Sequence, residues 1–187
     1  GSQVRDALEA AFADHGRIEL LVNAVGMIWN APMFKLEQGQ LNPHDLDDWR
    51  TVIEANLTAP FVVASEAARL MVRSGGGAIV NFSSIAAQGN TGQVAYSAAK
   101  AGLEGMTRTM SRELGPMGVR VNAISLGFID VATTRANVPR DQLDLHAGRT
   151  PTGGLGTAED VISAVEFLAE NPFVNGAILR VDGGLRL

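Results

Sequence analysis

Short, almost uninterrupted apolar segments alternate along this chain with segments of helical periodicity. Apolar runs of strand length occupy residues 18–22, 78–82, 119–124 and 177–181. Helices are expected at residues 3–14, 46–73, 94–114 and 157–169, with Asp45 or a neighbour as the cap of the second and a Thr157-x-x-Asp160 capping box at the start of the last. Residues 125–156 are expected to be rich in loops. Strands that alternate with helices imply parallel pairing through right-handed crossovers, and strands without polar alternation imply that both faces of the sheet are covered. The sequence therefore predicts an α/β fold, a doubly wound parallel sheet in three α/β/α layers.

The first apolar run, residues 18–22, is too apolar for a comfortable edge strand, which indicates a central strand with two neighbours. No glycine-rich phosphate-binding turn of the G-x-G-x-x-G kind occurs in the chain. Two further βα units, about 60 residues, would supply the missing neighbour and that turn. We therefore expect residues 1–187 to form one domain that is incomplete at its N-terminus, with the first βα units absent from the chain as given.

The composition argues against several classes of function. The net charge is −5 with both signs interspersed, which disfavours nucleic acid and anionic membrane surfaces as partners, and no segment reaches transmembrane length. The chain has no cysteine, and His15, His44 and His146 lie far apart without metal-ligand spacing, so no metal site is expected. We expect a cytoplasmic protein that acts on small molecules.

Residues 80–100 carry the groups of greatest chemical interest. A strand ends at Ser84, where ligands of doubly wound sheets bind, and the helix that follows carries Tyr96 and Lys100 on one face, four residues apart. A phenol has a pKa of about 10, and an adjacent ammonium favours its ionised form. Ser84 can donate a hydrogen bond to the same substrate oxygen. Tyr96 could instead be an ordinary surface tyrosine, but the preceding VNFSS segment favours a proton-transfer group at a carbonyl oxygen.

Asn56 is a candidate fourth member of this group. It lies in the middle of a predicted helix, where asparagine is a poor helix former. Pro60 has no N–H, so the carbonyl of Asn56 loses its helical partner and could hold a water molecule leading to Lys100. The alternative is that the two residues only mark a bend in the helix.

The sequence resembles the short-chain dehydrogenase/reductase family, from the family's third helix to its C-terminus. Among the members of that family, it is most similar to enzymes that resemble 3-oxoacyl-carrier-protein reductases. The SSIAAQG segment is also similar to cis-diol dehydrogenases. The resemblance implies a Rossmann-like fold, NADP or NAD as cofactor, a carbonyl or secondary alcohol substrate, hydride transfer between the two, and a homodimer or homotetramer. It rests on the segments LLVNAVG, NLTAPF, GAIVNFSS, YSAAKAG, VRVNAI, LGFID and LRVDGG.

The resemblance also implies roles for individual residues. Tyr96 would be the acid/base, Lys100 would lower its pKa and hold the nicotinamide ribose, and Ser84 would orient the carbonyl. Asn56 would maintain a water path. The family's usual spacing to the tyrosine points to Ser83 rather than Ser84, and Ser84 is preferred with a one-residue deletion in the loop.

For the cofactor, the resemblance implies that Asn23 and Gly26 line the cleft and that the backbone of Ile129 meets the carboxamide. Three positions depart from the family pattern: NAVG replaces NNAG at residues 23–26, Leu126 replaces a proline, and Val131 replaces a threonine. These departures leave open an alternative function, a truncated non-redox member that works as a cofactor-free dehydratase, isomerase or cyclase, or as a binding subunit.

Residues 27–44 are predicted to be an irregular, substrate-facing insertion. Its apolar side chains could line a substrate pocket or lid together with Leu126 and Phe128. Small residues of the predicted helix 94–114, among them Gly102 and Gly105, allow close helix packing, either within the chain or across a dimer interface.

Overall fold

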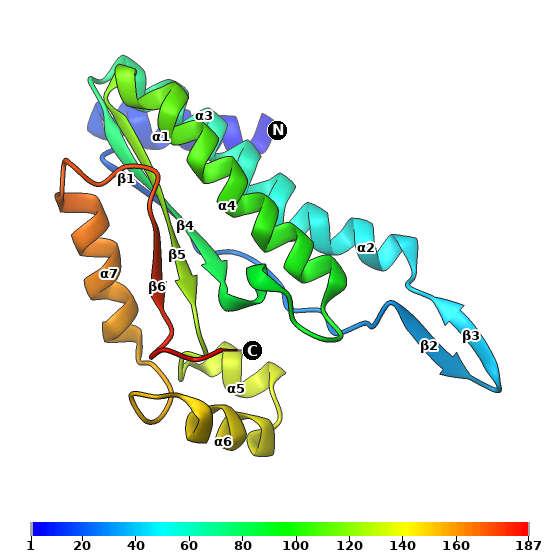
Figure 1. Cartoon of the computed structure of the whole chain (residues 1–187). Coiled ribbons are helices and arrows are strands. Elements are labelled where there is room, and N and C mark those ends of the chain that lie inside the picture. The colour runs from blue at the N-terminus through cyan, green and yellow to red at the C-terminus, as the bar shows by residue number, and fades with distance from the viewer. Residues whose placement is uncertain (1, 187) are drawn as a thin grey trace.

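The computed structural model describes residues 2–186 and contains a four-stranded parallel sheet. The strand order is β1-β4-β5-β6, and each neighbouring pair runs parallel (Figure 1). The predicted parallel α/β sheet is confirmed. The strands are β1 (Leu20–Asn23), β4 (Gly77–Ser84), β5 (Val119–Leu126) and β6 (Ile178–Val181).

Helices cover both faces of this sheet, as expected for three α/β/α layers (Figure 1). On one face lie α3 (Ala59–Arg73) and α4 (Val94–Leu114), with α1 (Ser2–His15) against α3. The other face is covered by α7 (Ala158–Glu170). Consecutive residues of β4 divide between the two cores, because strand side chains alternate: Ile79 packs with Met71 and Val121, whereas Val80 packs with Ile124 and Leu168.

The predicted helix 46–73 is interrupted in the structure. It comprises α2 (Leu46–Ile53), a π-helical turn η1 (Glu54–Thr58) and α3. Asp45 caps α2 by accepting the N–H groups of Asp47 and Asp48 at 2.7 and 3.1 Å. Pro60 supplies no N–H to the ladder, and the turn before it is widened so that Ala59 donates to Glu54, five residues back.

The prediction of an irregular segment at residues 27–44 is wrong for its second half. Strands β2 (Phe34–Glu37) and β3 (Gln40–Pro43) form an antiparallel hairpin that projects beyond α2 (Figure 1). The turn residues Gln38 and Gly39 both have positive φ, 52° and 78°, as a type I′ turn requires. Phe34 and Leu36 alternate with charged residues along β2, a strand pattern that the preceding Pro32 and the nearby Gly39 obscured.

The C-terminal third contains two helices in what was predicted as a loop-rich stretch. They are α5 (Ala132–Asn137) and α6 (Arg140–Arg149). The predicted capping box of α7 is confirmed, because Thr157 and Asp160 each accept the other's backbone N–H. Two short 3-10 turns complete the structure, η2 (Ile85–Gln88) and η3 (Gly115–Met117).

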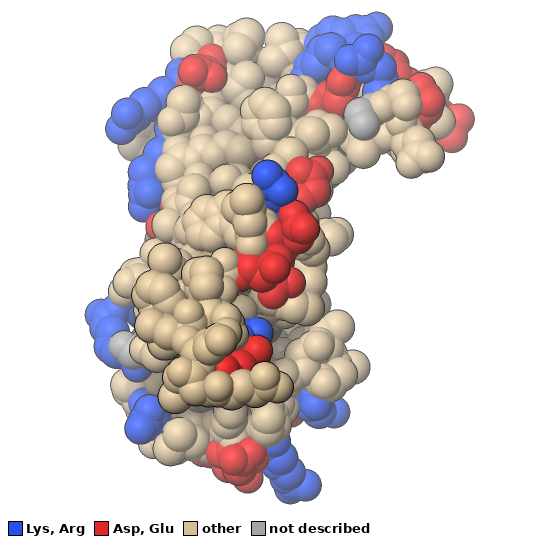
Figure 2. Space-filling model, turned by 90° about the vertical axis from the view of Figure 1, so that its right-hand side faces the viewer, with Lys and Arg blue, Asp and Glu red and all other residues tan. Residues whose placement is uncertain are grey.

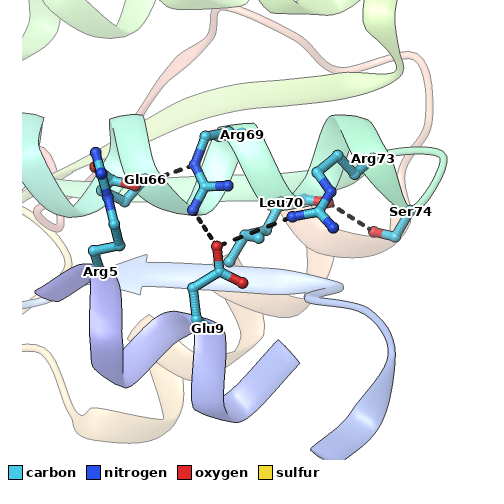
Figure 3. A network of polar contacts seen from close by, with 7 residues as sticks. All are labelled: Arg5, Glu9, Glu66, Arg69, Leu70, Arg73 and Ser74. Atoms are coloured by element: carbon cyan, nitrogen blue, oxygen red, sulfur yellow. Dashed lines mark hydrogen bonds and ion pairs between the residues drawn. The ribbon is translucent and has the colours of Figure 1, made fainter. Parts of the chain in front are cut away.

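Charged pairs attach α1 to α3, since α1 contributes no buried residue. Arg5 pairs with Glu66 at 2.7 Å, and Arg69 bridges Glu66 and Glu9 at 3.2 and 2.6 Å (Figure 3). Acidic and basic side chains are both scattered over the face in Figure 2, with wide uncharged areas between them. Among the described residues, no helix is both long enough and apolar enough to span a bilayer.

Candidate active site

The candidate site lies where β1 and β4 end and α4 begins. Ser84 is the last residue of β4, and Tyr96 and Lys100 occupy the first two turns of α4. Asn56 belongs to the π-helical turn, and Gly26 follows β1. The structure brings these five residues together, and the contacts below define their arrangement.

Tyr96 is buried, with 9% of its surface exposed. It belongs to an apolar cluster with Val52 and Ala95, against which Trp49 also packs. Burial raises the pKa of the Tyr96 hydroxyl, and the neighbouring Ser84 side chain opposes the rise. The phenol is therefore protonated at neutral pH.

Ser83 and Ser84 have different contacts, and only one of the two lies near Tyr96. Ser84 lies near Tyr96, where its side chain lowers the pKa of the phenol, and its Oγ accepts the N–H of Ala86 at 3.2 Å. Ser83 is buried elsewhere, where its hydroxyl donates to Glu104 Oε1 at 3.1 Å and to the carbonyl of Lys100 at 3.4 Å. Of the two, it is Ser84 that the structure brings to the phenol.

Lys100 is a buried cation, 5% exposed, whose Nζ donates to the carbonyl of Phe82 at 2.8 Å. Nζ lies 5.7 Å from the centre of the Tyr96 ring. Burial lowers the pKa of Lys100 to about 8. The pKa of Tyr96 is raised overall, because burial of the phenol outweighs the opposing effect of Ser84, and the effect of Lys100 on that pKa stays a prediction.

Asn56 uses its side chain to hold the loop after β1. Its Nδ2 donates to the carbonyl of Met27 at 2.9 Å and to that of Val52 at 3.0 Å, and its Oδ1 accepts the N–H of Met27 at 3.1 Å. Sequence reasoning considered the backbone carbonyl of Asn56 and missed this amide. An amide carries both a donor and an acceptor, so a fully buried asparagine signals a backbone partner.

Gly26 lies in the narrowest part of the site. A Cβ at this position would be 2.5 Å from Asn56 Oδ1 and 3.4 Å from Lys100 Nζ. Only a residue without a side chain allows the loop to pass this close to Asn56, whereas the approach to Lys100 is an ordinary contact distance.

Asn23 is placed at the end of β1 as expected, but its side chain is engaged within the protein. Its Nδ2 donates to Asn81 Oδ1 at 2.8 Å and to the carbonyl of Pro60 at 3.3 Å. Asn81 in turn donates to Thr107 at 2.9 Å. This buried network joins β1, β4 and α4, and sequence reasoning missed its two other members.

Ile129 is placed apart from this group. It forms an isolated β-bridge with Gly156 and lines a cavity of about 610 Å³ between residues 128–129, 150–156 and 180–184. Neither Tyr96 nor Lys100 lines that cavity. Of the apolar pocket candidates, Ile28 and Trp29 are 43% and 41% exposed. Phe128 stacks on His146 with ring centres 4.0 Å apart, whereas Leu126 packs against the core.

Comparisons with known proteins agree with this architecture. A family model described as enoyl-(acyl carrier protein) reductase matches residues 1–186. The chain is 35% identical to 3-oxoacyl-(acyl-carrier-protein) reductase of Thermotoga maritima over 98% of this chain and 72% of the relative. It is 34% identical to human 3-hydroxyacyl-CoA dehydrogenase type-2, again over 98% and 72%.

Two solved structures have closely similar folds. A gluconate 5-dehydrogenase from Burkholderia cenocepacia, in complex with NADP and tartrate, superposes with a TM-score of 0.86 at 32% identity, covering 98% of this chain and 71% of that one. A 7α-hydroxysteroid dehydrogenase complexed with NADH gives 0.87 at 26% identity, covering 99% and 70%. The family match over nearly the whole chain and the shared Rossmann-like fold agree with the sequence motifs, and this chain belongs to the short-chain dehydrogenase/reductase family.

Proposed function

We propose that this chain carries the substrate-orienting and proton-transfer residues of an oxidoreductase that interconverts a carbonyl and a secondary alcohol with NAD(P)(H). One observation carries the proposal: the Ser84 side chain is near enough to Tyr96 to lower the pKa of the phenol, and the ammonium of Lys100 is buried beside the same ring. Family membership supports it, since the relatives described above are named as reductases and dehydrogenases.

A protonated Tyr96 is the form that takes part in the reductive direction. A bound reduced nicotinamide would supply the hydride to the carbonyl carbon. Tyr96 donates its hydroxyl proton to the carbonyl oxygen as the C=O π bond breaks, and Ser84 donates a hydrogen bond to that oxygen. The raised pKa of Tyr96 keeps the phenol in the protonated form that this step needs.

Lys100 and Asn56 support the return of the proton. With a pKa of about 8, Lys100 is mostly protonated at neutral pH and stabilises the phenolate that proton donation leaves on Tyr96. The carbonyl of Asn56 lacks the N–H that a residue other than Pro60 would supply, and we assign it to a water molecule on the path from Lys100 to solvent.

The surroundings of Lys100 fit a hydroxyl-bearing ligand such as a nicotinamide ribose. An ammonium has three N–H donors, and in the described part of the chain Nζ has one acceptor, the carbonyl of Phe82. The bare backbone of Gly26 lies beside it. Lys100 and Tyr96 would hold the ribose, while the backbones of Asn23, Gly26 and Ile129 would line the cleft. NADP and NAD remain equal candidates.

The substrate class proposed is a small 3-oxoacyl thioester or a related carbonyl compound with an apolar portion. The two reductase and dehydrogenase relatives are named for acyl substrates. The half-exposed Ile28 and Trp29 on the loop after β1 agree with an apolar substituent. We place this activity in the cytoplasm.

We also propose a homodimer or homotetramer. On α4, Gly102 packs against Leu57 of the same chain, where a Cβ would lie 3.0 Å from that side chain, but a Cβ on Gly105 would meet nothing within 4 Å. Phe61 on α3 is 52% exposed. Light scattering of Gly105→Arg against wild type tests this assembly: a lower mass for the variant is expected, and an unchanged mass contradicts it.

The function is tested with the full-length protein by following nicotinamide absorbance with acetoacetyl-CoA and either NADH or NADPH, alongside calorimetric titration of each nucleotide alone. Turnover with at least one nucleotide is expected. Nucleotide binding without turnover of any 3-oxoacyl thioester contradicts the substrate class. If neither binding nor turnover is found, the redox function fails, and the cofactor-free acid/base alternative takes its place.

A further inference from the structure

The loop after β1 runs beside the first two turns of α4. At one end, a Cβ on Gly26 would lie 3.4 Å from Lys100 Nζ. At the other end, Ala31 forms an isolated parallel bridge with Gln93, the N-cap residue of α4. Gln93 and Lys100 are seven residues apart, and Tyr96 lies between them. The segment 27–31 therefore passes the level of Tyr96.

Both ends of this segment are held by side-chain amides. Asn56 makes two hydrogen bonds to the backbone of Met27, at 2.9 and 3.1 Å. At the far end, Gln93 Nε2 donates to Asn30 Oδ1 at 2.7 Å. The amide of Gln93 is itself oriented, because its Oε1 accepts from Asn90 Nδ2 at 2.9 Å.

The side chains in the middle of the segment are not buried, so packing does little to hold them in place. Ile28 and Trp29 are 43% and 41% exposed, whereas Ala31 at the bridged end is 2% exposed. Two large apolar side chains thus stand half-exposed at the level of Tyr96, and their position depends on the fixed ends.

We propose that Asn30 and Gln93 are positioning residues: their hydrogen bond holds segment 27–31 against α4, so that Ile28 and Trp29 form an apolar wall beside the Tyr96 hydroxyl and favour substrates with an apolar chain next to the carbonyl. The wall's effect on substrates rests on the proposed function. The hydrogen bond and its effect on Trp29 do not, so the two parts can fail separately.

Trp29 reports on the segment directly. The chain has two tryptophans, and Trp49→Phe leaves Trp29 as the only indole. In that background, Asn30→Ala and Gln93→Met each remove the hydrogen bond, and acrylamide quenching of Trp29 is expected to rise about twofold, because the indole becomes more accessible. Quenching that stays at the parent value in both variants overturns the proposal.

Two further variants separate this contact from general damage. Asn30→Asp keeps an acceptor for Gln93 Nε2 and is expected to restore the parent quenching. Gln40→Met repeats the chemical change of Gln93→Met on the exposed hairpin and is expected to leave quenching unchanged. Equal rises in Gln40→Met and Gln93→Met, or no rescue by Asn30→Asp, contradict a specific hydrogen bond.

Selectivity tests the wall. The ratio of kcat/KM for 3-oxooctanoyl-CoA to that for acetoacetyl-CoA is expected to fall about fivefold in Asn30→Ala and Gln93→Met, mainly through KM, with kcat for acetoacetyl-CoA within about twofold. The double variant should be no worse than either single one, since both remove one contact. A rise in quenching with an unchanged ratio overturns the wall. A full-length wild-type protein that reduces neither thioester refutes the proposed function and leaves the quenching result standing.

Discussion

The residues around Tyr96 and the segment between β5 and α7 are built in opposite ways. Around Tyr96, polar groups are buried and hydrogen-bonded: Asn56 and Asn81 are fully buried, and Lys100 is 5% exposed. Between β5 and α7, α5 has no buried residue and α6 has one, Leu143.

This difference concerns how firmly each region is held. Buried and paired polar groups are held in fixed positions by the sheet and by α4, as the proposed proton transfer would require. Sparsely packed helices tolerate substitution without unfolding the core. We therefore expect substitutions near Tyr96 to act sharply on rate and stability, and substitutions on α5 and α6 to act weakly on both.

The largest expected effect comes from one atom in the buried region. Tyr96→Phe removes the hydroxyl that donates the proton and keeps the ring in its apolar cluster. We expect kcat for acetoacetyl-CoA reduction to fall about 10³-fold with little change in thermal stability, because general acid catalysis contributes about 10²–10⁴-fold. Steady-state kinetics and calorimetric melting measure the two quantities, and retention of a tenth or more of kcat would refute the assignment.

A pair of leucines compares the two regions directly. Leu103 on α4 is 1% exposed and Leu143 on α6 is 8% exposed. Leu103→Ala is expected to cost about 2–5 kcal/mol of the free energy of unfolding, as core leucines do. Leu143→Ala should cost about 1 kcal/mol, since α6 offers little surrounding packing to lose. Urea denaturation measures both, and equal costs would remove the distinction between the regions.

The lowered pKa of the buried Lys100 makes the stability of the folded chain depend on pH. Its pKa falls from 10.5 to about 8 on folding, so between those values the folded chain binds fewer protons than the unfolded chain and stability rises with pH. The raised pKa of Tyr96 acts in the opposite direction above about 10, where the unfolded phenol ionises. The rise is therefore clearest between about pH 8 and 10.

The substitution Lys100→Met should remove that rise and stabilise the chain at neutral pH by on the order of 3 kcal/mol. Denaturant midpoints across this pH range provide the measurement. A slope that persists in Lys100→Met would assign it to another group.

Ser83 and Ser84 are adjacent in the sequence, but we expect their replacement by alanine to affect kcat differently. Ser84→Ala removes the hydroxyl that would donate a hydrogen bond to the substrate oxygen beside Tyr96, and it is expected to lower kcat about 10²-fold. Ser83→Ala removes a hydrogen bond to Glu104 and is expected to change stability by about 1 kcal/mol with kcat nearly unchanged. The reverse order of kcat values would move the catalytic role to Ser83.

Local sequence patterns predicted most of the fold. The four strands, helix α4 and the caps at Asp45 and Thr157 each depend on a few neighbouring residues, and the structure contains them. The hairpin was missed because Gln38-Gly39 is a weak turn signal compared with Asn-Gly or Asp-Gly.

The parts that could not be predicted depend on contacts between distant residues. Asn23 and Asn81 are 58 positions apart in the sequence, and nothing local indicates their hydrogen bond. The same holds for the amide of Asn56 and its loop partner. The direction of the Tyr96 pKa shift was missed because it is set by the depth of burial, which the motif does not contain.

Ser84 and a buried Tyr96 are proposed to act as one proton-transfer group. Tyr96 is the single tyrosine of the chain, so NMR titration of the protein with ¹³Cζ-labelled tyrosine reports its pKa directly. We expect a pKa above 10 in the wild-type chain and a still higher value in Ser84→Ala, because the Ser84 side chain opposes the effect of burial. A wild-type pKa at or below 10 that Ser84→Ala leaves unchanged would contradict it.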